Sequence, residues 1–188
     1  MTAPRDTTSG PAAPDAPYRV MTVCTGNICR SPMAEVVLRE RLTQEGLADR
    51  VVVDSTGVSS EETGNPMDDR ALDVLRSAGY TDDALRSHTA RQVTAEQLRD
   101  RDLVVAMTAD HARALRRLLD GSRETTAAPD LRMFRSFDAA APRTDDDRDL
   151  DVADPWYGGP EDFDVCLEQV EAAVEGIVAH VREAVARR

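Results

Sequence analysis

A short stretch near the N-terminus combines residue types that can bind and cleave a phosphate ester. Cys24 and Arg30 are separated by five residues, among them Gly26 and Asn27. A cysteine thiolate is a strong nucleophile, and a guanidinium offers a planar fork of donors that matches two phosphate oxygens. Gly and Asn tolerate positive φ, which turns successive peptide N–H groups inward to form an anion site. The pattern therefore predicts a phosphate-binding loop that stabilises the Cys24 thiolate as a nucleophile.

The segments on either side of this loop would hold it at the edge of a sheet. Residues 18–23 alternate and are rich in β-formers, which predicts a strand. Apolar residues recur at helical spacing over 33–42, so a helix should begin near Ser31 or Pro32 and end at Gly46. The loop then lies at the carboxyl end of a strand, where open α/β sheets bind ligands and a helix N-terminus favours an anion.

The rest of the chain repeats the alternation of strand and helix. Further strands are predicted at 51–55, 102–107 and 131–134, and further helices at 68–77, at 109–119 and from Gly159 to the C-terminus. Residues 139–151 are acidic and without periodicity, which predicts an exposed loop. Strands alternating with helices indicate a three-layer α/β/α domain around a central parallel sheet of about four strands.

Composition limits the class of protein. A chain of 188 residues with 41% hydrophobic residues fits one domain, and a net charge of −12 argues against a nucleic-acid-binding protein. No segment reaches the roughly 20 apolar residues of a membrane span, and no signal peptide is evident. Three cysteines, an odd number, fit a reducing cytoplasm better than a disulfide framework. Residues 1–17 lack large apolar side chains and are expected to be a disordered tail before a domain over 18–188.

Several motifs resemble one enzyme family. The stretch Cys24-Thr-Gly-Asn-Ile-Cys29-Arg30-Ser31-Pro32 is similar to the signature of the low-molecular-weight protein-tyrosine phosphatases. Further blocks match that family in the family's order: Ser55-Thr56-Gly57, Asp68-Asp69-Arg70-Ala71, Ser87-His88-Thr89-Ala90-Arg91 and Asp154-Pro155-Trp156-Tyr157. The resemblance implies the family's Rossmann-like fold and hydrolysis of protein phosphotyrosine and small aryl phosphates through a phosphocysteine intermediate, with no metal and no cofactor.

The resemblance also implies roles for individual residues. Cys24 would be the nucleophile, Arg30 the phosphate ligand and Asp154 the general acid, with Trp156 and Tyr157 forming a wall against the substrate ring. The remaining loop residues would bind the substrate: Thr25, Gly26, Asn27, Ile28, Cys29 and Ser31. A hydrogen-bond network of Asn27, Ser31, Ser55 and His88 would support the loop, and Cys29 would form a reversible disulfide with oxidised Cys24.

Other residues of reactive type have simpler explanations. His111 and His180 are interpreted as surface residues, and Cys166 lies on the apolar stripe of the last helix and is expected in the core. Five aspartates before the Asp-Pro motif are interpreted as solvated charge: Asp145, Asp146, Asp147, Asp149 and Asp151. Zinc binding by Cys24 and Cys29 is disfavoured, because no second pair of ligands follows at suitable spacing.

The sequence departs from the family at two places. Members commonly have an aromatic residue in the segment that here spans Val58–Asn65, where Glu61 and Glu62 stand instead. Many members have Asp at the position of Thr108, so Arg30 could pair with Glu35 in its place.

Three alternatives remain open. A thioredoxin-linked arsenate reductase would need further redox cysteines, and none lies between Arg30 and Val165. A protein-arginine phosphatase of the same family is possible because the aromatic residue of the 58–65 segment is missing. A catalytically idle phosphoprotein-binding module is disfavoured by the intact Cys24, Arg30 and Asp154. The expected partners are phosphotyrosine-containing proteins, with neither nucleic acid nor a membrane, and the expected state is a monomer or weak dimer.

Overall fold

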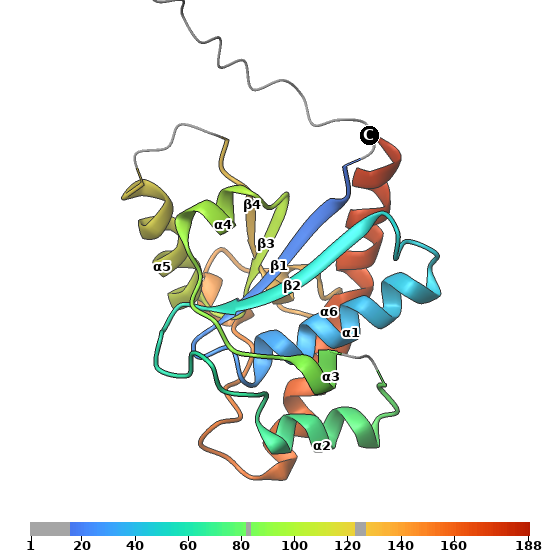
Figure 1. Cartoon of the computed structure of the whole chain (residues 1–188), viewed down its shortest axis with the longest axis vertical. Helices are drawn as coiled ribbons and strands as arrows, with labels where there is room; N and C mark the ends of the chain where they lie inside the picture. Colours follow the sequence, from blue (N-terminus) through green and yellow to red (C-terminus); the bar gives the residue numbers. More distant parts are fainter. Residues whose placement is uncertain (1–15, 82–83, 123–126) are drawn as a thin grey trace, which may run out of the picture.

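Four parallel strands form the centre of the computed structural model, which describes residues 16–81, 84–122 and 127–188 (Figure 1). The strand order is β2-β1-β3-β4. The strands are β1 (Tyr18–Cys24), β2 (Val51–Gly57), β3 (Leu103–Ala106) and β4 (Asp130–Met133). The helices are α1 (Arg30–Gln44), α2 (Asp69–Ser77), α3 (Ala84–Ser87), α4 (Ala95–Arg99), α5 (Ala109–Asp120) and α6 (Pro160–Ala186), with 3-10 turns η1 (Phe134–Phe137) and η2 (Asp147–Leu150).

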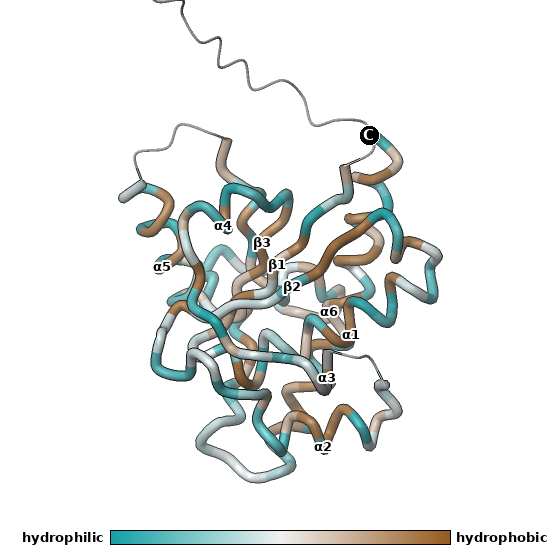
Figure 2. The backbone as a smooth tube through the Cα atoms, viewed as in Figure 1, coloured by the Kyte–Doolittle hydropathy of each residue, from teal (hydrophilic) through white to brown (hydrophobic). Residues whose placement is uncertain are grey.

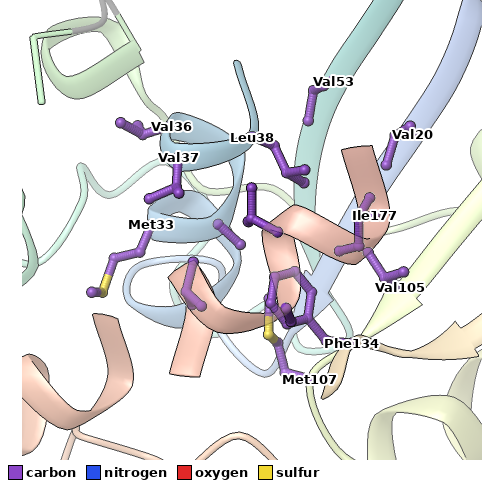
Figure 3. Close-up of a cluster of buried hydrophobic side chains, with 14 of the residues drawn as sticks. Val20, Met33, Val36, Val37, Leu38, Val53, Val105, Met107, Phe134 and Ile177 are labelled. Carbon is purple, nitrogen blue, oxygen red and sulfur yellow. The ribbon is translucent and has the colours of Figure 1, made fainter. Parts of the chain in front are cut away.

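One face of the sheet is covered by α1 and α6, which pack against each other and against β1 and β2 (Figure 1). Their shared core contains fully buried side chains from all these elements, including Val20, Leu38, Phe134 and Ile177 (Figure 3). Each such side chain contributes roughly 1.5–3 kcal/mol when removed from water. The start of α1, which carries Arg30, is therefore held firmly against the sheet.

The opposite face is covered by α4 and α5. A second cluster of buried residues joins these helices to the sheet: Met21, Val23, Val93, Leu98, Val104, Ala106, Ala109, Ala112, Leu115 and Met133. Figure 2 shows hydrophobic residues along the central strands and hydrophilic residues on the outer turns of the helices. Strands buried on both faces explain why residues 103–106 form a continuous apolar run. The predicted three-layer α/β/α arrangement is confirmed.

The predicted strands and longer helices are confirmed with shifts of a few residues at their ends. α3, α4 and both 3-10 turns were not predicted, and η2 lies within the segment 139–151, which was predicted to be an exposed loop. Short elements carry little periodicity, which explains the omission. Of the expected tail, residues 1–15 lie outside the described residues. In the part of the chain that the structure describes, no helix is long and apolar enough to span a membrane.

Candidate active site

The loop between β1 and α1 turns its peptide carbonyls outward. Four of these carbonyls accept hydrogen bonds from neighbouring segments: Val58 N–H to Cys24 O at 3.0 Å, Ser59 N–H to Thr25 O at 2.9 Å, His88 Nε2 to Asn27 O at 2.7 Å and Asp68 N–H to Ile28 O at 2.9 Å. In a trans peptide the N–H points opposite to the carbonyl. The following amides, those of Thr25, Gly26, Ile28 and Cys29, therefore face the interior of the loop. Such a ring of N–H groups binds an anion.

Asn27 gives the loop its curvature and holds it in place. Its φ is +62°, the only positive φ of a non-glycine residue among those described. Its buried side chain is fully used: Nδ2 donates to Ser31 Oγ at 3.0 Å and Ser55 Oγ at 2.9 Å, and Oδ1 accepts from Arg91 N–H at 3.0 Å. Gly26, by contrast, does not have positive φ. The expectation that both residues use this conformation is therefore wrong for Gly26.

The predicted supporting network is assembled, and it extends further than expected. Ser55 Oγ donates to Glu35 Oε2 at 2.6 Å, so the chain of bonds from Asn27 ends on a buried carboxyl group. The pKa of Glu35 is raised, because the effect of burial outweighs the opposite effect of the Ser55 hydrogen bond. Glu35 also lies 3.4 Å from Arg39. The expectation that it pairs with Arg30 is wrong, because its carboxyl group points toward β2.

His88 holds the loop through the carbonyl oxygen of Asn27. Burial lowers the pKa of His88, so the ring is neutral near pH 7. Because Asn27 O can only accept, the His88 Nε2 at 2.7 Å must carry the proton and donate. The expected role of His88 in supporting the loop therefore matches its contacts.

Cys24 lies at the base of the loop with its sulfur directed toward the centre. The residue is 2% exposed, and Sγ accepts from Asn27 N–H at 3.3 Å. Ser31 Oγ lies 3.0 Å from Sγ and 3.2 Å from Thr56 O. Ser31 has one proton, so it can donate to Thr56 O beside a thiol and to Sγ beside a thiolate. The hydroxyl can therefore follow the charge of the sulfur.

Arg30 brings a buried guanidinium to the same centre. Nη1 donates to Val152 O at 3.3 Å, and Nη2 donates to Thr25 Oγ1 at 3.3 Å and to Asp154 Oδ2 at 2.6 Å. The Nε atom is buried and has no hydrogen-bond partner among the described residues. A buried guanidinium with an open donor can accept an anionic ligand, since an unmet buried donor costs about 1–3 kcal/mol.

Asp154 and the aromatic residues after it form the outer side of the site. The Asp154 carboxylate is partly exposed and accepts from Trp156 N–H at 3.2 Å. Trp156 is 41% and Tyr157 91% exposed. Together with Ile28, they line a pocket above Cys24. Glu61 and Glu62 also line it, at the place where the family's aromatic residue was expected.

Arg70 ties this outer loop to the start of α2, a role that was not predicted from the sequence. Its guanidinium donates to Gly158 O at 3.2 Å and Trp156 O at 3.4 Å and pairs with Asp68 at 3.0 Å. It also lies 5.6 Å from the centre of the Trp156 ring, a cation–π distance. The indication in the sequence was the match of residues 68–71, which include Arg70, to a motif of the family.

Two further residues differ from their interpretation. Thr108, which stands where many members of the family have Asp, caps α5 by accepting from His111 N–H at 3.3 Å. Asp151 is not merely solvated, because its carboxylate accepts from Ala109 N–H at 2.7 Å. His111 is 5% exposed, so its interpretation as a surface residue is wrong. Its polar side chain lies at the end of α5 nearest the loop.

The geometry above matches a known family over nearly the whole chain. The sequence model of the low molecular weight phosphotyrosine protein phosphatases matches residues 19–187. The chain belongs to this family. A low molecular weight protein-tyrosine-phosphatase of Streptomyces coelicolor is 47% identical, over 91% of this chain and 98% of the relative.

Solved structures of phosphatases have the same fold. A protein tyrosine phosphatase of Entamoeba histolytica, crystallised with Hepes in its active site, superposes with a TM-score of 0.74 at 28% identity, over 89% of this chain and 98% of that chain. A Drosophila arginine phosphatase superposes with a TM-score of 0.73 at 25% identity, over 86% and 96% respectively. The names of these two proteins differ in the phosphorylated residue that they imply.

Proposed function

We propose that this protein hydrolyses phosphotyrosine in proteins, and small aryl phosphates, through a phosphocysteine intermediate. The observation that carries the proposal is the open Nε donor of buried Arg30 beside the ring of inward N–H groups and the Cys24 sulfur. A phosphoryl group placed there would receive a bidentate pair of bonds from Nε and Nη2. Its phosphorus would then face the nucleophile.

The proposed reaction proceeds in two displacements. The Cys24 thiolate attacks phosphorus, an S–P bond forms, and the bond from phosphorus to the aryl oxygen breaks while Asp154 gives its proton to that oxygen. Asp154 then removes a proton from water, which attacks phosphorus and releases phosphate and the thiolate. Ser31 donates to the departing sulfur. In the unliganded site Asp154 pairs with Arg30 as a carboxylate. Substrate would take over the guanidinium, and the released carboxylate would take up a proton from solvent before it acts as the acid.

The substrate class follows from the pocket walls. Ile28, Trp156 and Tyr157 offer apolar and aromatic surface that suits a phenyl ring. Glu61 and Glu62 would attract a cationic group, which keeps phosphoarginine as the second candidate. We expect phosphotyrosine peptides to have the higher kcat/KM. A higher kcat/KM for a matched phosphoarginine peptide would assign the enzyme to the arginine class instead.

The central experiment is turnover of p-nitrophenyl phosphate by the wild type and Cys24→Ser. The variant should lose activity and still bind inorganic phosphate in calorimetry, because the loop amides and Arg30 remain. Arg30→Ala should lose both. Normal turnover by Cys24→Ser would rule out the covalent mechanism. Absence of turnover by the wild type would favour a binding module, and thioredoxin-dependent reduction of arsenate would favour the reductase.

We also propose that Cys29 protects the nucleophile from oxidation. Cys29 is a buried, free cysteine of the loop, and burial raises the pKa of its thiol, so it stays a thiol while the Cys24 thiolate attacks phosphate esters. Peroxide would convert Cys24 to a sulfenic acid, which would condense with the Cys29 thiol to a disulfide and water. Cys29→Ser should make peroxide inactivation harder to reverse with dithiothreitol. Mass spectra of the oxidised wild type showing only unpaired Cys29 would contradict this role.

The proposed setting is the cytoplasm, with phosphoprotein substrates and a chain that is a monomer or weak dimer. The odd number of three cysteines supports a reducing compartment. The folded unit would be residues 18–188. Light scattering of the full chain and of a chain starting at Tyr18 tests both the oligomeric state and the boundary.

A further inference from the structure

His111 approaches the phosphate-binding loop from the sheet face opposite α1. It lies in the first turn of α5, which is fixed by the Thr108 cap and by Asp151 on Ala109 N–H. The ring is 5% exposed. None of the motifs that identify the family includes this residue, and the reaction proposed above does not use it.

The ring contacts a residue of the loop. His111 Nε2 lies 2.9 Å from Thr25 Oγ1, and the same oxygen accepts from Arg30 Nη2 at 3.3 Å. Arg30 Nη2 has two protons, one directed to Thr25 and one to Asp154 at 2.6 Å. The Thr25 oxygen therefore fixes the rotation of the guanidinium, whether the second proton binds Asp154 or a phosphoryl oxygen.

The positions of the available protons decide which atom donates in the hydrogen bond between His111 and Thr25. His111 Nδ1 is buried without a partner among the described residues. If Thr25 donated to Nε2, Nδ1 would carry an orphaned buried N–H, which is rarer in proteins than an unpaired acceptor. The proton therefore belongs on Nε2, which donates to Thr25 Oγ1. The Thr25 hydroxyl proton is then free to point into the pocket that Thr25 lines.

The surroundings keep the ring neutral. Burial, and then the positive charge of Arg30, lower the pKa of His111 to about 4, against smaller opposite effects of Asp154 and Asp110. A neutral ring beside Arg30 avoids repulsion between two cations. It can orient Thr25 without weakening the positive potential that binds phosphate.

We propose that neutral His111 is a positioning residue for phosphate binding, which orients the Thr25 hydroxyl toward the phosphoryl oxygens and holds the Arg30 fork in place. The inference rests on the proposed phosphatase function. Because the His111–Thr25 bond is a single neutral hydrogen bond, its loss should weaken phosphate binding by roughly 3- to 10-fold.

The test compares His111→Gln with His111→Asn. Both side chains are carboxamides, but the Gln nitrogen can occupy the place of Nε2, whereas the Asn nitrogen falls at the place of Nδ1 and cannot reach Thr25. The Ki of inorganic phosphate is measured as a competitive inhibitor of p-nitrophenyl phosphate hydrolysis. We expect His111→Asn to raise Ki by roughly 3- to 10-fold and His111→Gln to stay within about twofold of wild type. Equal Ki values for the two variants would overturn the proposal.

Thr25→Val supplies an independent arm, because Thr25 is exposed and its replacement should not disturb folding. It should raise Ki at least as much as His111→Asn, and the double variant should be no worse than Thr25→Val alone, since both act through one hydroxyl. Effects of the two substitutions that multiply would overturn the proposal. So would an unchanged Ki for Thr25→Val, which can be measured even if His111→Asn does not fold. His180→Gln, on α6, is the matched control, and it should leave the Ki of phosphate unchanged. Wild type that neither binds phosphate nor hydrolyses the ester would instead refute the proposed function.

Discussion

Gly57→Ala should damage the site by displacing its backbone. Gly57 ends β2 beneath the phosphate-binding loop, and a Cβ added there would lie 2.4 Å from Thr25 O, 3.0 Å from Gly26 C and 3.1 Å from Asn27 N. The neighbours are backbone atoms, so no side-chain rotation relieves the clash. Ordinary C···O contacts are about 3.4 Å, so the loop must move by about 1 Å. The φ of Gly57 is not positive, which makes the effect purely steric.

A shift of about 1 Å in a reacting group can cost on the order of 100-fold in rate. We therefore expect kcat/KM for p-nitrophenyl phosphate to fall by roughly that factor. The Ki of phosphate should rise as well, because Val58 and Ser59 hold the loop carbonyls at 3.0 and 2.9 Å and those bonds must lengthen. Circular dichroism and the melting temperature would establish that the variant is folded.

The matched control is Gly121→Ala at the end of α5. Its added Cβ would come no closer than 3.3 Å to Arg117 O, far from the site, and the backbone there is already helical. This variant should keep wild-type kinetics. A folded Gly57→Ala enzyme with kcat/KM within about threefold of wild type would show that the close approach of β2 does not position the loop.

Three other perturbations test separate parts of the site. Asp154→Asn should lower kcat on phosphotyrosine by roughly 10²- to 10⁴-fold and on p-nitrophenyl phosphate markedly less, because a stable phenolate leaves without a proton. Asp145→Asn, at an exposed position, is the control. A uniform loss of kcat across leaving groups would mean that another residue is the general acid. Arg70→Ala should free the loop that carries Trp156 and lower kcat on the order of 10-fold with little change in the Ki of phosphate, whereas an equal change in Ki would place Arg70 in phosphate binding. Folded Glu35 holds its proton to higher pH than the unfolded chain does, so stability should fall as pH rises from about 4.5 through the raised pKa. Glu35→Gln should therefore gain stability relative to wild type between pH 4.5 and 8 in urea melts, and a constant difference would refute the linkage.

The arrangement of the loop could be predicted from local sequence, because Cys24, Asn27 and Arg30 lie close together between a strand and a helix. Asp154 could not be predicted in this way. It lies 124 positions from its Arg30 partner, and only the resemblance to the phosphatase family distinguished it from neighbouring aspartates. A residue whose partner depends on the fold carries no local signal.

His111 illustrates a different failure. A histidine at the start of an amphipathic helix is usually exposed, and only the tertiary packing of α5 beside the loop buries it. Gly57 does carry a local signal, since a glycine at the end of a strand often marks the close approach of another backbone. Arg70 stood in a recognised block, but its guanidinium acts on carbonyls that are contributed by a distant loop.

The wide separation in sequence between Arg30 and its hydrogen-bond partners also matters while the chain is being synthesised on the ribosome. Val152 and Asp154, which bind the guanidinium, follow it by 122 and 124 positions, and α6 beyond them covers α1. A ribosome adds about 5–20 residues per second, so the segment carrying the nucleophile waits roughly 6–25 s for the residues that complete its surroundings. Contacts of such long sequence separation also form late in folding. A nascent chain in which Cys24 is already made therefore lacks the contacts around Arg30 until Asp154 and α6 have been synthesised.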